Sequence, residues 1–480
     1  MKQGTSSPGY PTLTTRFVRA ALNQTYKSET VNHFSLVTTD SRKIQRGCLF
    51  VALKGDRFDG HAFIDSAIRS GAAGILVKKG TKIPKSGPPI EIFEVDDTLE
   101  AYRALAGAWR REFDIPVVVV AGSVGKTTTK ELLTSLLRAK WPNVLKTEAS
   151  QNGFIGVAMT LLELRPEHDA AVIEVGIDEP GAMEKHIPLI CANAVVLTAI
   201  GPEHLEKLID IETVAKEECK AFELIAKTGG TVFVNLDDPW ITKGASQISA
   251  FSPRFEFTLE AVNPSPLKLV AEWISNPSQL TVSGAGFQAA RFEIPIPGDH
   301  NARNALAAIA IAHVWGLTDD EIRVGLKKFK GAEGRSQVCE TRDGIQVLCD
   351  FYNANPTSTE AGLKVLNKLP KPGRKTWACL GDMLELGKDE EAFHRGLAPT
   401  LLSLKIDGVY LYGPRMKNLA DELARKKFSG TLRHMDTHAE LANELIENVR
   451  PGDAILIKGS RGMKMEEVYK ILIMKKGIAP

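Results

Sequence analysis

Short runs of apolar residues recur along the chain, and most of them are followed by a segment with helical spacing. Such runs are typical of strands that are buried on both faces of a parallel sheet. We predict strands over residues 47–53, 74–77, 115–120, 170–175, 194–199, 231–236, 345–349, 377–380, 409–412 and 454–457. Their alternation with helical segments predicts an α/β fold.

Two other patterns lie between these runs. Apolar residues at helical spacing predict helices over residues 63–70, 98–113, 127–140 and 302–315. In the third of these helices, four leucines between positions 132 and 137 form one apolar stripe. Residues 250–297 instead alternate between apolar and polar positions and contain Pro and Gly, which predicts antiparallel hairpins.

These patterns divide the chain into three α/β units. We expect an N-terminal domain over residues 1–113, a central domain with a parallel sheet over 114–330, and a C-terminal α/β domain over 331–480. A length of 480 residues fits this division, because a domain commonly spans roughly 100–200 residues.

Composition restricts the class of protein. The 60 Lys and Arg residues nearly balance the 58 Asp and Glu residues, which argues against a dedicated nucleic-acid binder or a polybasic membrane protein. No stretch reaches the ~18 apolar residues of a transmembrane helix, and the first residues lack the apolar core of a secretory signal. The six cysteines are far apart in sequence, so we expect free thiols in a cytoplasmic protein.

Several predicted strands end in Gly followed by polar or charged residues. Lys126, Glu174, His204, Asp350 and Lys458 all lie at or just beyond such strand ends. In open α/β sheets, ligands bind outside the carboxyl ends of the strands. Ordinary turn chemistry explains some of these endings but not the gathering of charged side chains.

Residues 122–129, Gly-Ser-Val-Gly-Lys-Thr-Thr-Thr, lie between a predicted strand and a predicted helix. That context predicts a phosphate-binding loop. Its glycines let backbone N–H groups turn toward phosphate oxygens, and the helix N-terminus adds partial positive charge. Lys126 can reach the β- and γ-phosphates, and the Thr127 hydroxyl can bind Mg²⁺.

The other candidates each have two interpretations from sequence alone. Glu174 can complete an Mg²⁺ shell or be a solvated acid at a strand end, and His204 can be functional or structural. On charge pattern, Lys216 is a surface lysine. Arg335 and Asp350 can reach a nucleotide from the third domain or form an interdomain salt bridge.

Taken together, these segments resemble the ATP-dependent Mur ligases. The resemblance rests on the phosphate loop, Glu174, Gly-Pro-Glu-His204, Val-Ala-Lys216, residues 298–305 (GDHNARNA) and Gly334-Arg335. Residues 350–356 (DFYNANP), 380–387 (LGDMLELG) and 458–464 (KGSRGMK) narrow it to the member that completes the pentapeptide. Residues 39–43 (TDSRK) and 53–60 (LKGDRFDG) resemble the family's uridine-nucleotide domain.

The resemblance implies a three-domain architecture, with a central P-loop ATPase domain and a Rossmann-like C-terminal domain that closes on ATP and binds the incoming dipeptide. It implies an enzyme that adds D-alanyl-D-alanine to UDP-N-acetylmuramoyl-tripeptide in peptidoglycan precursor synthesis. ATP would convert the terminal carboxylate into an acyl phosphate, which the dipeptide amine attacks. ATP and Mg²⁺ (two ions) are the implied cofactors. We expect a cytoplasmic monomer that binds neither nucleic acid nor membrane.

Carried over residue by residue, the resemblance also implies site roles. Catalysis would involve Lys126, His204 and Lys216. ATP contacts would come from Gly122, Ser123, Val124, Gly125, Lys126, Thr127, Thr128, Asn301, Arg335 and Asp350. Mg²⁺ would be bound by Thr127, Glu174, His204 and a carbamylated Lys216, and substrates would be contacted by Ser41, Arg42, Asn353 and Asn355.

Three segments depart from the family pattern. Val124 replaces a small polar residue in the phosphate loop, and residues 151–154 and 176–181 also differ. We expect the latter two segments to face substrate, which leaves open another amide ligase of the same family with a different amine acceptor. A P-loop kinase or ATPase, or a non-catalytic nucleotide-binding protein, explains less of the sequence.

Overall fold

The computed structural model describes residues 11–25, 33–55, 58–84, 89–248, 253–260, 262–275, 277–369 and 373–479. It divides into two compact units. The first comprises Met1–Val118, Asn143–Val175 and Glu184–Asn193, and the second comprises Val119–Pro142, Gly176–Met183 and Ala194–Pro480.

The first unit contains a four-stranded parallel sheet with the order β1-β2-β3-β4. The elements of this part of the chain are α1 (Thr15–Ala21), β1 (Val37–Thr38), η1 (Ser41–Lys43), β2 (Leu49–Val51), η2 (Gly60–Phe63), α2 (Ile64–Arg69), β3 (Gly74–Lys78), β4 (Glu91–Val95) and α3 (Thr98–Arg110). β2 is buried along its whole length. This explains why its sequence is a continuous apolar run.

The first unit also contains β6 (Val144–Lys146), α5 (Phe154–Leu162) and β7 (Ala170–Glu174). β6 and β7 pair in parallel. The buried Arg103 on α3 donates to the carbonyl of Phe154 at 3.1 Å. Trp109 donates to the carbonyl of Leu164 at 3.2 Å. α3 is thereby fixed to the start of α5 and to the loop that follows it.

The central sheet of the second unit has the strand order β13-β12-β11-β10-β9-β8-β5. Its elements are β5 (Val117–Ala121), α4 (Lys126–Leu137), α6 (Ala182–Ile190), β8 (Ala194–Leu197), α7 (Leu205–Leu208), α8 (Ile211–Lys227), β9 (Thr231–Asn235), α9 (Pro239–Ala245), β10 (Arg254–Thr258), β11 (Lys268–Ser275), β12 (Ser278–Gly284), β13 (Phe287–Glu293), α10 (Asp299–Val314) and α11 (Asp319–Lys328). β5 and α6 are divided between the two units.

The hairpins predicted over residues 250–297 are confirmed only in part. β11, β12 and β13 pair antiparallel. β10, however, runs parallel to both β9 and β11, so the prediction is wrong for that strand. Alternation of apolar and polar residues reports which face is buried, and it does not report the direction of the neighbouring strand.

A second sheet in the same unit has the order β14-β15-β19-β16-β17-β18. All of its pairs are parallel except β14–β15. The elements are β14 (Gln337–Glu340), β15 (Gln346–Asp350), α12 (Pro356–Leu366), β16 (Thr376–Gly381), η3 (Gly387–Asp389), α13 (Glu390–Arg395), α14 (Ala398–Ser403), β17 (Gly408–Tyr412), α15 (Lys417–Arg425), β18 (Thr431–Met435), α16 (His438–Asn448), β19 (Ala454–Lys458), η4 (Arg461–Met463) and α17 (Glu466–Lys476).

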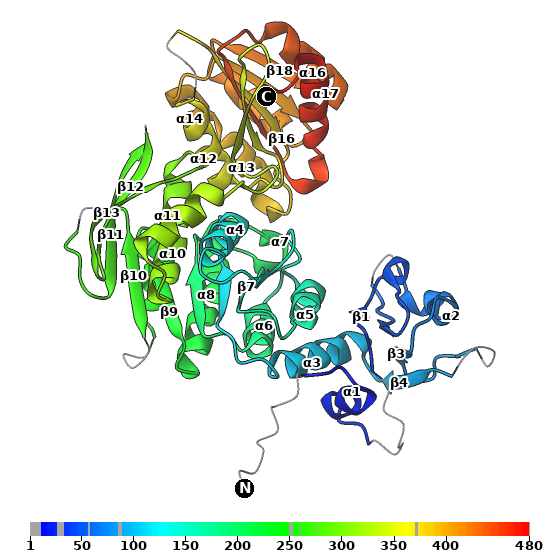
Figure 1. The fold of residues 1–480 in the computed structure, drawn as a ribbon. Helices are drawn as coiled ribbons and strands as arrows, with labels where there is room; N and C mark the ends of the chain where they lie inside the picture. The colour runs from blue at the N-terminus through cyan, green and yellow to red at the C-terminus, as the bar shows by residue number, and fades with distance from the viewer. Residues whose placement is uncertain are drawn as a thin grey trace. The chain divides into compact units, whose positions relative to one another are not determined.

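Helices cover both faces of this C-terminal sheet (Figure 1). Leu348 on β15 packs with residues of α12, α14 and α15. Its neighbours Val347 and Cys349 pack on the opposite face with residues of α16 and α17. Because successive strand residues point to opposite faces, each strand contributes to two cores. The carboxyl ends of β15, β16 and β19 therefore lie at one edge, where Asp350 and Lys458 end their strands.

Candidate active site

The phosphate loop has the predicted strand–loop–helix geometry. β5 ends at Ala121, and α4 begins at Lys126. Gly122 and Gly125 have φ angles of 111° and 95°, a region that favours glycine. A Cβ atom on Gly125 would lie 2.4 Å from Oδ1 of Asn304. The loop therefore requires glycine at both positions.

Two hydrogen bonds fix the start of this loop. Oε2 of the buried Glu218 accepts the N–H of Gly122 at 2.9 Å. The N–H of Ser123 donates to the carbonyl of Ala199 at 2.7 Å. The loop is thus anchored on α8 and on the end of β8, and the positive N-terminus of α4 lies at its far end.

Lys126 lies against the loop that precedes it. Its Nζ donates to the carbonyls of Gly122 and Ser123, and it lies 3.3 Å from Oε1 of Glu203. Burial raises the pKa of Glu203, and Lys126 opposes that shift. Burial also raises the pKa of Glu218, to about 8.

Sequence reasoning missed both of these acids. Glu218 lies on the buried face of α8, among Val214, Ala221 and Phe222. A carboxylate at an apolar position of an amphipathic helix is costly to bury without a partner, and this feature of the sequence could have identified Glu218 as a candidate. Glu203 directly precedes His204. Its pairing with Lys126 spans 77 residues of sequence, and no local pattern predicts it.

His204 is in the same turn as Glu203 but has a different partner. Its Nδ1 lies 2.5 Å from Oε2 of Glu385, in the loop after β16. The hydrogen bond to Glu385 raises the pKa of His204. The N–H of Leu205 also donates to the carbonyl of Glu385 at 3.0 Å. The turn after β8 is therefore docked on the C-terminal domain.

Lys216 lies elsewhere. It is on the exposed face of α8, where Glu212, Cys219 and Trp240 join it around a separate cavity of about 360 Å³. Residues 216 and 218 are roughly 200° apart around a helix. When Glu218 contacts the phosphate loop, Lys216 therefore points away from it. The structure does not bring Lys216 together with Lys126 and His204, and its part in the catalytic and metal cluster stays a prediction.

Glu174 ends β7 in the first unit. Its side chain is buried, and Oε1 accepts a hydrogen bond from Nδ2 of Asn152 at 2.8 Å. Its own N–H donates to Oγ1 of Thr147 at 3.0 Å. Among the described residues, no three His, Cys, Asp or Glu side chains form a group that could bind a metal by themselves.

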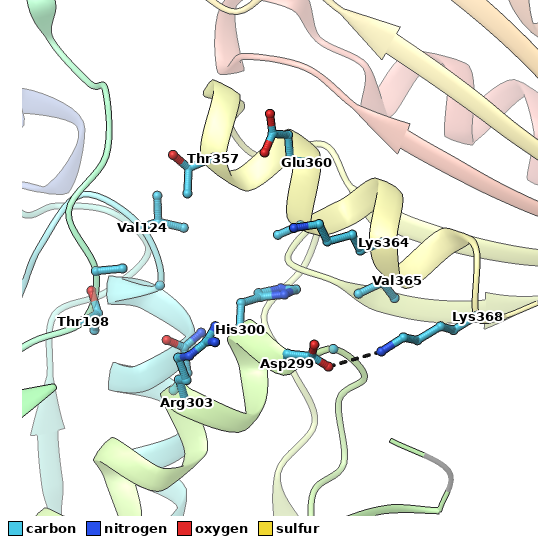
Figure 2. Close-up of a pocket in the computed structure, with 15 residues that line it drawn as sticks. Val124, Thr198, Asp299, His300, Arg303, Thr357, Glu360, Lys364, Val365 and Lys368 are labelled. Carbon is cyan, nitrogen blue, oxygen red and sulfur yellow. Dashed lines mark hydrogen bonds and ion pairs between the residues drawn. The ribbon is translucent and has the colours of Figure 1, made fainter. Parts of the chain in front are cut away.

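A cavity of about 270 Å³ adjoins the phosphate loop (Figure 2). Val124, Gly125 and Thr198 line one side of it, and residues of α10 and α12 line much of the rest. Figure 2 shows Lys364 extending from α12 into this space. Its other lining residues are Ala199, Gly298, Asp299, His300, Arg303, Asn304, Thr357, Glu360, Ala361, Val365 and Lys368. We call it the phosphate-loop cavity.

Asn301 is not among these lining residues. It is buried, its Nδ2 donates to the carbonyl of Pro297 at 2.8 Å, and its Oδ1 accepts from Asn304. Both polar atoms of its side chain are hydrogen-bonded within the protein, so the structure gives no support to the predicted adenine contact. His300 and Asn304 line the cavity instead.

Asp350 and Arg335 belong to the C-terminal domain. Oδ2 of Asp350 lies 2.6 Å from Nζ of the buried Lys458, and Oδ1 accepts the N–H of Ser336 at 2.9 Å. The Arg335 guanidinium lies 4.2 Å from the ring centroid of Tyr352. Neither residue lines the phosphate-loop cavity. Asp350 is therefore part of a buried ion pair that fixes the edge of this sheet.

Asn353 and Asn355 line a second cavity, of about 200 Å³, together with Glu203, His204 and Glu385. We call it the amide cavity. Asn355 also caps α12, because its Oδ1 accepts the N–H of Ser358 at 2.8 Å. The structure thus brings the two asparagines predicted for the dipeptide next to His204.

Ser41 and Arg42 form the start of η1 in the first unit. The exposed Arg42 makes two hydrogen bonds to Asp40, at 2.9 and 2.8 Å. These bonds lower the pKa of Asp40 to about 2. The guanidinium is therefore already held by a carboxylate at the position where a uridine nucleotide contact was predicted.

These features define an α/β protein with a phosphate loop whose cavity is lined in part by α12 of a second α/β domain. Three family models match it in order: "Mur ligase family, catalytic domain" over residues 33–110, "Mur ligase middle domain" over 120–312, and "Mur ligase, glutamate ligase domain" over 334–461. The chain belongs to the Mur ligase family. The predicted three-domain α/β architecture is confirmed, and the chain is a ligase by family.

Curated relatives extend over nearly the whole chain. The UDP-N-acetylmuramoyl-tripeptide–D-alanyl-D-alanine ligase of Bacillus subtilis is 32% identical and covers 95% of this chain and 96% of its own length. The Escherichia coli ligase of the same name is 33% identical, over 91% of this chain and 93% of its own length.

Solved structures agree in fold. MurF from Acinetobacter baumannii superposes with a TM-score of 0.84 at 26% identity, and covers 97% of this chain and 99% of its own. MurF from Thermotoga maritima in complex with ADP has a TM-score of 0.78 at 26% identity, over 92% and 97% of the two chains.

Across the described residues, no helix combines the length and the apolar character needed to cross a bilayer.

Proposed function

We propose that this chain is the ATP-dependent ligase that joins D-alanyl-D-alanine to UDP-N-acetylmuramoyl-tripeptide. The observation that carries the proposal is that relatives with this name match it over more than nine-tenths of both chains. The amide cavity supports it further, because residues 350–356, which narrowed the resemblance, supply part of its lining.

ATP fits the phosphate-loop cavity. The loop presents the N-terminus of α4, Lys126 lies at that N-terminus, and Arg303 and Lys364 add positive charge on the other walls. Such an arrangement favours a polyphosphate. We assign the phosphates to residues 122–128. His300 and Asn304 replace Asn301 in the assignment, and Arg335 and Asp350 are retained only as residues that could approach on closure.

Mg²⁺ would enter with the nucleotide, because it prefers phosphate oxygens, waters and one or two carboxylates. It would neutralise charge between the γ-phosphate and the substrate carboxylate. Thr127, Glu174 and His204 are its proposed ligands. A carbamate on Lys216 would lie on the exposed face of α8, so it is left out of the proposed metal site.

The reaction requires activation, since a carboxylate has no leaving group that an amine can displace. Attack of the tripeptide carboxylate on the γ-phosphorus releases ADP and forms an acyl phosphate. The dipeptide amine then attacks the carbonyl carbon, loses a proton, and phosphate leaves. Lys126 stabilises the transferring phosphoryl group, and the His204–Glu385 pair lies beside the cavity assigned to the amine.

The substrates occupy different parts of this assignment. D-alanyl-D-alanine is small and carries one ammonium and one carboxylate, which suits the amides of Asn353 and Asn355 and the neighbouring Glu385. Ser41 and Arg42 are assigned to the uridine nucleotide, with Asp40 exchanged for a phosphate. The domain boundaries near 114 and 331, the monomeric state and the cytoplasmic location stay predictions.

Phosphate release from ATP tests the proposal. We expect release only when UDP-N-acetylmuramoyl-tripeptide and D-alanyl-D-alanine are both present, with a pentapeptide product by mass spectrometry. If phosphate release requires the tripeptide, does not depend on the dipeptide and increases with another amine, that amine is the acceptor. Release with neither substrate would indicate an ATPase.

A further inference from the structure

Lys126, the lysine assigned to phosphates, lies against the carboxylate of Glu203. The ammonium already lies near two loop carbonyls and the Glu203 carboxylate, whose two oxygens are 3.3 and 3.5 Å away. Both side chains are only 12% exposed. A pair this well shielded from water interacts more strongly than a surface ion pair.

Glu203 and a bound phosphate would compete for the same ammonium. Lys has three N–H donors and no acceptor, and a second anion close to a carboxylate is repelled by it. We propose that Glu203 is a positioning residue that holds Lys126 against the loop in the nucleotide-free protein and yields it to the β-phosphate on binding. This inference rests on the proposed nucleotide site.

The turn that carries Glu203 gives this exchange a second consequence. Glu203 faces the phosphate loop, and His204 pairs with Glu385 of the C-terminal domain. Pro202 precedes them and limits backbone freedom. A change of partner at Glu203 therefore occurs next to the contact that docks the C-terminal domain.

The test is the affinity for ADP in the absence of divalent cations, measured by calorimetry. Glu203→Gln keeps the shape of the side chain and removes its charge. We expect ADP to bind about tenfold more tightly, because the ammonium has one competitor fewer. Glu206→Gln removes an exposed charge three residues away and is expected to leave the affinity unchanged.

A second background separates exchange at Lys126 from simple repulsion. In Lys126→Met, Glu203 has no ammonium to hold, and Glu203→Gln should then change the ADP affinity by less than about threefold. An equal gain in both backgrounds would overturn the proposal and assign a purely repulsive role to Glu203. An unchanged or weaker affinity of Glu203→Gln in the wild-type background, with an unchanged melting temperature, would overturn it as well.

Failure of the proposed function gives a different result. If the wild-type protein does not bind ADP at all, the nucleotide assignment fails, whatever the variants do. If the wild-type protein binds ADP and Glu203→Gln does not differ from it, only the role of Glu203 fails.

Discussion

The phosphate-loop cavity and the amide cavity both adjoin α12 and its N-terminal loop, yet they differ in charge. The phosphate-loop cavity contains Arg303, Lys364 and Lys368. The amide cavity contains two asparagines and the His204–Glu385 pair. Three cations against the two acids Asp299 and Glu360 leave a positive excess, which suits a polyanion. In the amide cavity, the acids Glu203 and Glu385 lie with the imidazole of His204 and the cation Arg461, which suits a ligand that carries both charges.

One element, α12 with its preceding loop, contributes to both cavities. Asn353 and Asn355 precede α12 and line the amide cavity, while Thr357 and Lys364 lie on the helix and line the phosphate-loop cavity. Displacement of α12 would change both cavities together.

The largest effect is expected from Lys126→Ala. Removal of the only lysine in the phosphate loop should reduce ATP turnover by on the order of 10³-fold or more, because the charge developing on the phosphoryl group loses its counterion. Phosphate release measures this loss. Binding of the uridine nucleotide substrate, measured separately by calorimetry, should stay close to wild type.

Loss of both functions in Lys126→Ala would contradict the division of tasks between the domains. An unfolded variant would also lose both, so the melting temperature is the necessary control. Lys126→Arg keeps the charge and should recover part of the turnover.

A smaller and reciprocal effect is expected from Asn353→Ala and Lys364→Ala. The first should raise KM for the dipeptide about tenfold and leave KM for ATP unchanged, because one polar contact to the acceptor is lost. The second should raise KM for ATP by a similar factor and leave the dipeptide unaffected. Steady-state kinetics with one substrate varied at a time measures both constants.

The two variants serve as controls for each other. If either one raises both KM values, α12 transmits the change between the cavities, and the separation of charge is not a separation of function.

The phosphate loop could be predicted because the residues that specify it are close together in the sequence. Two glycines, a lysine and the start of a helix follow one another within a few residues, and each requirement acts on its own position. The same holds for β15 and β19, whose apolar runs ended at Asp350 and Lys458 as expected.

The partners of those residues could not be predicted, because they depend on tertiary packing. Glu218 contacts Gly122 across 96 residues of sequence. Lys458 is paired with Asp350 across 108 residues. Asn301 is near the cavity in sequence, but its position on α10 turns it toward Pro297. Motifs identify the elements at a site, and the fold decides which face of each element reaches it.

A still smaller effect, and a pH dependence, is expected from Glu385→Gln. The pKa of His204 is raised from 6.5 and that of Glu385 is lowered from 4.5, each first by the hydrogen bond between them. The pair therefore stabilises the protein above pH 4.5 and below the raised pKa of His204. Its contribution is fully present between pH 4.5 and pH 6.5, and it is lost as the pH rises through the raised pKa of His204 or falls through the lowered pKa of Glu385.

Thermal unfolding of wild type and Glu385→Gln between pH 5 and pH 9 measures this dependence. We expect the variant to melt about 1–3 °C lower near pH 6 and to approach wild type at alkaline pH. Glu360→Gln, in the phosphate-loop cavity, should show a difference from wild type that does not vary with pH. A constant deficit in Glu385→Gln would indicate that its backbone contact with Leu205, and not the ion pair, docks the turn.

The smallest effect is expected from Lys216→Ala. Lys216 lies on the face of α8 opposite to Glu218, beside a third cavity that contains Trp240. Its loss should change kcat/KM by less than about threefold, as is usual for exposed residues away from a site. Lys220→Ala, on the same cavity, is the matched control.

A large loss of activity in Lys216→Ala that short carboxylates restore would mean that a carbamate on Lys216 binds the metal. α8 would then have to rotate in the active enzyme, and that rotation would remove Glu218 from Gly122. The activity of this one variant therefore decides which face of α8 belongs to the phosphate loop.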